Sequence, residues 1–382
     1  MIEQPPLSLY IHIPWCIRKC PYCDFNSHEQ KKDVAVLPEQ QYLEALLADL
    51  KVDLKLEDSN REIHSVFIGG GTPSLLTGQF YIDLFDQLHD QLNFSDNAEI
   101  TIEANPGAID SKHFDGFLEA GINRLSLGIQ SFSDYSLRHL GRIHDSQQAY
   151  NAFNIARSCG FKNINIDIMH GLPEQSFAEG IDDLHQAIDL SPEHLSWYQL
   201  TIEKNTVFFK TPPELPAENI LDDLFIEGLS LLERSHYYQY EVSAFARDQK
   251  HSRHNKNYWQ FGDYIGIGAG AHGKITLPNQ QIIRRWKTRT PEDYLSKRDK
   301  IAGSKPIDRS DIALEFMMNH LRLNEGFSAQ LFIKRTGLLF SDIEPILINL
   351  LQQKLLEKQQ SLFRPTPKGR LFLNNMIAYF EG

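Results

Sequence analysis

The sequence predicts an α/β protein, with a partial (β/α)6 barrel of the TIM type followed by a mostly helical, winged-helix-like domain. Over the first two hundred residues, short β-type runs alternate with amphipathic helical runs, which is the pattern of parallel β/α units. Beyond residue 304 the chain becomes helical, with one short strand pattern before its last helix. Its 382 residues also exceed what one hydrophobic core normally serves, so more than one domain is expected.

The strands of the barrel are predicted from alternating apolar residues, and a helical pattern such as the one over 39–56 lies between each pair. Six such units, rather than eight, indicate an incomplete barrel. The predicted strands cover 7–13, 64–68, 98–103, 124–130, 163–168 and 194–200.

The polar faces of these strands predict a cavity inside the barrel. In the fifth strand three isoleucines share one face, so Asn165 and Asp167 share the other. A small closed barrel normally fills its interior with branched apolar residues, so a polar interior indicates a ligand site. The alternative for each residue is a buried polar group that has found a partner. Inward positions in the other strands include Tyr10, His12, Glu103, Ser126 and Gln130.

The rest of the chain divides into two further regions, which sets the expected domains at 1–235, 236–304 and 305–382. The middle region is rich in aromatic residues and glycine and is expected to connect the other two. The last region is predicted to form helices over 309–323, 328–335, 341–356 and 367–379 and a strand over 361–366. It holds 10 Lys and Arg against 8 Asp and Glu, a nearly balanced charge that does not favour sequence-specific DNA binding.

Composition narrows the functional class. Hydrophobic residues make up 41% and charged residues 23%, as in a globular protein, and the net charge of −12 argues against a nucleic-acid partner. No apolar run is long enough to predict a membrane span, and no signal peptide is recognised. With only four cysteines, we expect a reducing, cytoplasmic location.

Three of the four cysteines, Cys16, Cys20 and Cys23, lie within eight residues directly after the first predicted strand. Cubane iron–sulfur clusters usually take four thiolates, so three would leave one iron open to a small molecule. Pro21 stiffens the loop by fixing φ. Zinc bound by three thiolates and a histidine is an alternative, although zinc ligands usually come as two separated pairs.

A glycine-rich loop, Gly69-Gly-Gly-Thr-Pro-Ser74, follows the second predicted strand. Adjacent glycines allow the backbone to approach a ligand closely. The loop lacks the Gly-Lys-Ser/Thr ending of a phosphate-binding P-loop. A tight turn alone would explain two of its glycines.

Five motifs in order, Leu-Tyr-Ile-His-Ile-Pro-Trp-Cys, Gly-Gly-Gly-Thr-Pro-Ser, Glu-Ala-Asn-Pro-Gly, Ser-Leu-Gly-Ile-Gln-Ser-Phe and Leu-Gly-Arg-Ile-His, resemble the oxygen-independent coproporphyrinogen oxidase family of radical S-adenosylmethionine (SAM) proteins. The resemblance covers essentially the whole chain. It implies a 4Fe–4S cluster held by Cys16, Cys20 and Cys23, with SAM on the open iron. Arg142 could pair with the SAM carboxylate by its planar fork, and Tyr22 could cover the adenine. The implied SAM contacts are Tyr10, Gly70, Gly71, Thr72, Glu103, Gln130, Arg142 and Asp167.

Two branches of that family differ in function. The decarboxylase branch has a fourth cysteine two residues after the third and a long N-terminal extension, whereas this chain has Phe25 there and fifteen residues before Cys16. The heme-chaperone branch carries His-Asn-x-x-Tyr-Trp, which is present as residues 254–259. The resemblance therefore favours a heme chaperone, with the radical SAM decarboxylase as the alternative and enzymatic activity left open.

The chaperone reading implies heme as a further cofactor and cargo. Histidine is a common axial ligand of heme iron, and Tyr258 and Trp259 offer flat faces to a macrocycle. His254 is the expected ligand; a packed aromatic loop with a hydrogen-bonded histidine is the alternative, and His272 is a second candidate. The expected partner is a heme-acceptor protein, such as a respiratory haemoprotein, and both a monomer and a homodimer are compatible with this reading.

Overall fold

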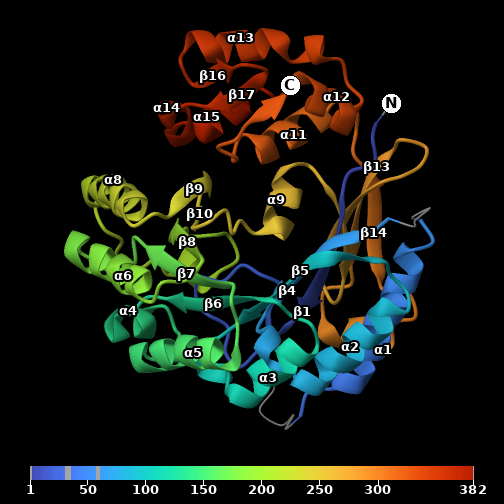
Figure 1. The fold of residues 1–382 in the computed structure, drawn as a ribbon, viewed down its shortest axis with the longest axis vertical. Helices are drawn as coiled ribbons and strands as arrows, with labels where there is room; N and C mark the ends of the chain where they lie inside the picture. Colours follow the sequence, from blue (N-terminus) through green and yellow to red (C-terminus); the bar gives the residue numbers. More distant parts are fainter. Residues whose placement is uncertain (1, 31–35, 57–60, 382) are drawn as a thin grey trace.

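A computed structural model of the protein describes residues 2–30, 36–56 and 61–381. Its centre is a curved sheet in which six parallel strands are each followed by one or more helices (Figure 1). This arrangement is the predicted partial barrel. The strands are β1 (Leu7–Ile13), β4 (Ile63–Gly70), β5 (Phe94–Ala104), β6 (Arg124–Gln130), β7 (Ile164–His170) and β8 (His194–Gln199).

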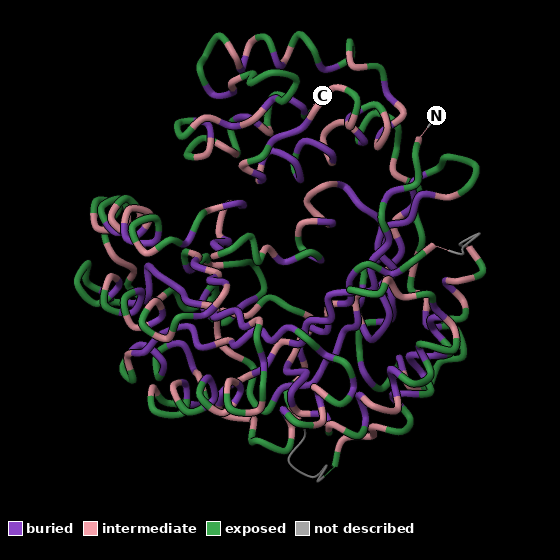
Figure 2. The backbone as a smooth tube through the Cα atoms, in the orientation of Figure 1, coloured by how far each residue is buried: buried purple, intermediate pink, exposed green. Residues whose placement is uncertain are grey.

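Amphipathic helices cover the outer side of this sheet, and buried residues concentrate on the strands and the helix faces beneath them (Figure 2). Local signals fix their ends: α5 begins with an Asp145–Gln148 capping box and ends at Gly160, whose φ is +116°. The helices are α1 (Glu39–Asp53), α2 (Gly78–His89), α3 (Ser111–Glu119), α4 (Asp134–His139), α5 (Ser146–Cys159), α6 (Phe177–Asp189) and α8 (Glu218–Arg234). The short helix α7 (Val207–Lys210) instead packs through Phe208 against Tyr22 of the cysteine loop.

The region 236–304 contains strands that extend the barrel sheet at both ends, which the sequence did not indicate. One pair follows β8, and β11 pairs in parallel with β1 on the other side. The sheet order is β14-β13-β12-β11-β1-β4-β5-β6-β7-β8-β10-β9. The added elements are β9 (Tyr238–Glu241), β10 (Ala244–Ala246), α9 (Arg253–Trp259), β11 (Asp263–Ile267), β12 (His272–Thr276), β13 (Ile282–Lys287), α10 (Pro291–Ser296) and β14 (Ile301–Pro306).

The C-terminal part forms helices around a small three-stranded sheet and lies over α9 and β9 (Figure 1). Its hydrophobic core includes Phe261 and Ile282, so it packs against the extended sheet. Among the described residues, no helix is both long and apolar enough to cross a membrane. The elements are α11 (Ile312–His320), β15 (Phe327–Ser328), α12 (Ala329–Thr336), α13 (Glu344–Gln352), β16 (Leu356–Gln359), β17 (Leu362–Pro365), α14 (Pro367–Leu371) and α15 (Leu373–Ala378).

Two helix predictions in this part were too long. The helix expected over 341–356 ends at Gln352, because Lys354 turns the chain with a φ of +58° and Leu356 starts a strand. The helix expected over 367–379 is interrupted at Phe372.

Candidate functional site

A cavity of about 510 Å³ opens at the C-terminal ends of the barrel strands, where barrel enzymes bind their ligands. The structure brings most of the predicted site residues to its wall, while two of them, Tyr10 and His254, lie outside it. The predicted residues that line the cavity are Cys16, Cys20, Tyr22, Cys23, Gly70, Gly71, Thr72, Glu103, Gln130, Arg142 and Asp167.

The cysteine loop lies between two short paired strands, β2 (Trp15–Cys16) and β3 (His28–Glu29). Each cysteine sulfur has a polar neighbour. Thr72 Oγ1 donates to Cys16 Sγ at 3.5 Å, Arg142 Nη1 donates to Cys20 Sγ at 3.6 Å, and the Cys23 sulfur is 3.7 Å from Ser27 Oγ. Hydroxyl and guanidinium donors of this kind stabilise negative charge on sulfur. The loop is therefore chemically suited to a thiolate-bound cluster.

Burial raises the pKa of the Cys16 and Cys23 thiols above the ordinary value. Metal binding to this loop must therefore release protons. Within the described ranges, no three His, Cys, Asp or Glu side chains converge closely enough to bind a single metal ion. A zinc site would need that convergence, whereas in a cubane cluster each thiolate binds its own iron.

The glycine-rich loop packs directly on the segment that leads into the cysteine loop. Gly71 N donates to the carbonyl of Ile13 at 2.6 Å, and Thr72 N donates to the carbonyl of Trp15 at 2.7 Å. A Cβ added to Gly71 would lie 2.5 Å from the Trp15 carbonyl oxygen, so a side chain cannot be accommodated there without a shift. The glycines thus hold the backbone of two site loops in contact.

Two carboxyl groups inside the cavity have raised pKa values. Burial, reinforced by the charge of Asp167, raises the pKa of Glu103 to about 8. Burial also raises the pKa of Asp167, although Asn165 and Ser126 donate to it at 2.8 and 3.1 Å. Glu103 is therefore mostly protonated at neutral pH when no cation is near. A cationic ligand would favour its ionised form.

Arg142 and Gln130 both line the cavity beside Gly128. Besides its contact with Cys20, Arg142 donates from Nη2 to the Gly128 carbonyl at 2.7 Å. Gln130 has a φ of +74°, and its side-chain oxygen accepts a hydrogen bond from the Tyr198 hydroxyl at 2.7 Å. A non-glycine residue in this left-handed region is strained, a feature that recurs at ligand sites.

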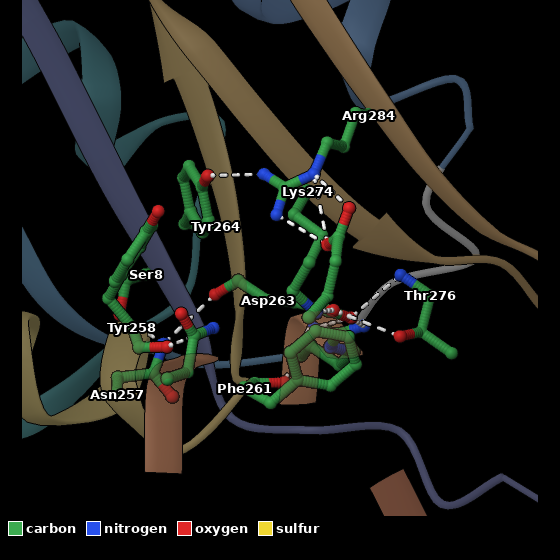
Figure 3. Close-up of polar contacts among 12 residues, drawn as sticks. Ser8, Asn257, Tyr258, Phe261, Asp263, Tyr264, Lys274, Thr276 and Arg284 are labelled. Atoms are coloured by element: carbon green, nitrogen blue, oxygen red, sulfur yellow. Dashed lines mark hydrogen bonds and ion pairs between the residues drawn. The ribbon is translucent and has the colours of Figure 1, made fainter. Parts of the chain in front are cut away.

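Helix α9 carries the His-Asn-x-x-Tyr-Trp motif and divides it between two faces. His254 and Asn257 are buried, whereas Asn255 and Trp259, one turn apart, line the cavity. Asn257 Nδ2 donates to Ser8 Oγ at 2.9 Å and to the carbonyl of Asp263 at 3.0 Å, which ties the helix to β1 and β11 (Figure 3).

His254 is packed inside the barrel, away from the cavity wall. Its Nδ1 is 3.5 Å from Ser65 Oγ, and its ring centroid lies 5.3 Å from that of Phe67 and 6.3 Å from that of Tyr10. Burial lowers the pKa of His254 to about 3, so its imidazole is neutral. Tyr10 in turn contacts His12 Nδ1 at 3.0 Å.

Sequence reasoning missed several side chains that line the cavity, among them Tyr198, Glu241 and Arg322. In β8, Tyr198 faces the opposite side of the strand from Trp197 and Gln199. The period-two pattern that was applied to the other strands would therefore have found it. Glu241 and Arg322 pair at 2.8 Å between the end of β9 and the turn after α11. No pattern along the chain marks that pair.

The Radical SAM superfamily model matches residues 10–187, and the HemN C-terminal domain model matches residues 307–372. The heme chaperone HemW of Haemophilus influenzae is 48% identical over 383 residues, which cover 100% of this chain and 99% of that protein. The chain belongs to the HemW family. HemW of Escherichia coli is 47% identical and HemW of Bacillus subtilis 32%, with at least 98% of each chain covered.

Coproporphyrinogen III oxidase (HemN) from Escherichia coli, a radical SAM enzyme, has the same fold. Its TM-score is 0.82 at 24% identity, over 99% of this chain and 90% of that one. As a radical SAM protein of the HemW family, the chain carries a 4Fe–4S cluster and SAM as cofactors. The three-cysteine loop, the adjacent glycine loop and the polar cavity fit both groups. A cluster held there would supply electron transfer at its open iron.

Proposed function

We propose that this chain is a cytoplasmic heme chaperone, which binds heme and passes it to an acceptor protein. The observation that carries the proposal is the full-length similarity, at 48% identity, to the heme chaperone HemW of Haemophilus influenzae. Cys16, Cys20 and Cys23 would ligate the cluster. The cavity residues Tyr22, Gly70, Gly71, Thr72, Glu103, Gln130, Arg142 and Asp167 would contact SAM. Tyr10, the remaining proposed contact, lies outside the cavity wall near Phe67 and His254, so SAM would have to extend to it.

The size of the cavity bears on where heme binds. A volume of about 510 Å³ is typical of a site for one small ligand. SAM and a macrocycle would therefore not both be enclosed. Trp259 lies at the wall formed by α9; Arg322 stacks over one face of its indole, so the flat apolar face offered to a macrocycle is the other one. The proposed heme position is across this face, with part of the macrocycle outside the cavity.

His254 remains the proposed axial ligand, and the structure adds a requirement to that proposal. Its imidazole is neutral, as metal binding demands, but it is packed against Ser65 and Phe67. To reach heme at the Trp259 face, α9 would have to rotate or shift. The hydrogen bonds of Asn257 to Ser8 and Asp263 would then break.

The test uses anaerobically reconstituted protein with a full cluster and SAM. Hemin should produce a Soret band at near-stoichiometric ratios, and an apo-haemoprotein added afterwards should acquire that heme. Coproporphyrinogen III, supplied with SAM and a reductant, should not yield protoporphyrinogen. Steady protoporphyrinogen formation would instead support the decarboxylase. Absence of both heme binding and turnover would overturn both readings.

The acceptor is proposed to be a haemoprotein, with a respiratory haemoprotein as the first to test. A homodimer is proposed as the assembled state. Size-exclusion chromatography with light scattering, run with and without the cluster, would measure it. A single monomer peak under both conditions would rule the dimer out.

A further inference from the structure

One side chain links the C-terminal domain to the cavity. Arg322 follows α11, and within the described part of residues 307–372 it alone lines the cavity wall. Arg18 and Arg142 are the other arginines at the wall; Arg18 lies in the cysteine loop, and Arg142 is bonded to the Gly128 carbonyl and Cys20. Arg322 is thus the cation on the Trp259 side of the cavity.

The guanidinium of Arg322 is held in a defined position. Its Cζ lies 4.3 Å from the centroid of the Trp259 ring, a cation–π arrangement. Its Nε and Nη2 donate to the same oxygen of Glu241, Oε1, at 3.2 and 2.8 Å. Glu241 itself is only 6% exposed, and an antiparallel β-bridge to Leu323 positions its backbone. The aromatic face and the carboxylate together fix the plane of the guanidinium.

The pairing leaves part of the guanidinium without a partner. Both hydrogen bonds to Glu241 involve one carboxylate oxygen, and Nη1 makes no hydrogen bond to any described residue. The Arg322 side chain is 30% exposed, so solvent and ligands can reach it. An arginine fork suits a carboxylate because two parallel N–H groups match its two oxygens. One edge of Arg322 thus stays available to an anionic group.

We propose that Arg322 recognises a carboxylate on the ligand that lies across Trp259. The proposal rests on the proposed function: heme is a planar macrocycle with two propionate groups, and Arg322 would bind one of them. Glu241 holds the guanidinium in place and competes with the ligand for it. The C-terminal domain therefore takes part in ligand selection through this side chain.

The experiment compares hemin with its dimethyl ester, which keeps the macrocycle and iron and lacks both carboxylates. Difference spectra are recorded on cluster-loaded protein with SAM. Arg322→Gln should weaken hemin binding roughly tenfold, as expected for one lost charged hydrogen-bonding group, and leave the diester unchanged. Wild-type protein should prefer hemin to the diester by a similar factor, and Arg322→Gln should bind both alike. Glu241→Gln should keep or increase hemin affinity.

Arg284→Gln is the matched control. Arg284 pairs with Glu315 at 2.6 Å and so also joins the extended sheet to α11, but it does not line the cavity. It should leave the hemin-to-diester ratio unchanged. If Arg322→Gln fails to fold, Arg322→Lys keeps the charge and should retain part of the preference.

An equal loss of hemin and diester affinity in Arg322→Gln, or no loss of either, would overturn the role of Arg322 while leaving heme binding intact. If wild-type protein binds neither compound, the proposed function fails and this inference falls with it. The two failures are therefore distinguishable in one titration series.

Discussion

The carboxyl group of Glu103 and the backbone of Gly70 are joined by a hydrogen bond of 3.1 Å from the amide N–H to Oε2. The contact joins the end of β5 to the glycine-rich loop, and Gly70 itself packs on His12 with a φ of +114°. Only one oxygen of Glu103 is engaged with a described donor. The other is available to a ligand that brings donors or positive charge into the cavity.

Glu103→Gln should weaken SAM binding and stabilise the protein without SAM. The pKa of Glu103 is raised to about 8, so the folded state binds a proton that the unfolded state releases between about pH 4.5 and 8. Folding stability contributed by this group therefore falls as pH rises through that range. The glutamine is neutral throughout, so the gain in Tm should be larger at pH 8 than at pH 5, by several degrees.

SAM binding should show the complementary pH dependence. SAM carries a permanent positive sulfonium charge, which favours ionised Glu103, so affinity should rise with pH up to about 8 and then level off. Calorimetric titration should detect proton release at pH 7, and this release should be lost in Glu103→Gln. Equal proton release in both proteins would show that another group titrates.

Replacement of Cys16, Cys20 or Cys23 by serine should abolish the iron–sulfur absorbance after anaerobic reconstitution. Each would remove the only protein ligand of one iron. Cys159 provides the internal control because it lies at the end of α5, where it packs against the main core instead of lining the cavity. Cys159→Ser should load a full cluster. A cluster retained in any of the three loop variants would refute that residue as a ligand.

His254→Ala should lose or shift the Soret band of bound hemin, whereas His272→Ala should not. His254 is buried and neutral, while His272 is exposed at the start of β12. Because His254 packs against Phe67, the alanine variant should also be less stable, by roughly 1–3 kcal/mol. Denaturant titration measures this loss of stability separately from the loss of heme ligation. An unchanged Soret band in a folded His254→Ala protein would assign the histidine a packing role only.

The barrel strands were predictable because each carries its own alternating pattern. The limits of β6, Arg124–Gln130, were predicted to the residue, and its polar face does line the cavity. The strands between residues 238 and 306 were not predictable, since β11 becomes part of the sheet through pairing with β1, more than two hundred residues away. Such pairing leaves little trace in the local sequence.

The candidate site likewise combines parts that local motifs predict with parts that depend on long-range packing. The cysteine and glycine loops could be found from the sequence because their motifs are local, and the structure brings both loops to the cavity wall. The motif at residues 254–259 gave no sign that His254 and Trp259 lie on different faces of α9, since their orientation depends on how the helix packs. The Glu241–Arg322 pair joins residues 81 positions apart and became visible only in three dimensions.

Asp183 should act on the SAM site from a position outside it. This buried residue of α6 accepts hydrogen bonds from Ser131 Oγ at 2.7 Å and Phe132 N at 2.6 Å, the two residues that follow the strained Gln130. The two hydrogen bonds go to different carboxylate oxygens, and asparagine has only one acceptor oxygen. Asp183→Asn can therefore keep one of them but not both. The turn should then relax, Gln130 should leave its contact with Tyr198, and SAM affinity should fall roughly three- to tenfold.

Asp182→Asn, on the exposed side of the same helix, controls for a general effect on α6. Burial raises the pKa of Asp183 to about 6, so its contribution to stability falls as pH rises from about 4 to 6. Asp183→Asn should remove this slope, whereas Asp182→Asn should retain most of it, because the Asp182 charge is a smaller cause of the raised Asp183 pKa than burial. Isothermal titration with SAM and thermal unfolding at several pH values measure the two effects independently. Normal SAM affinity in a protein that has lost the slope would mean that Asp183 supports the fold without positioning Gln130.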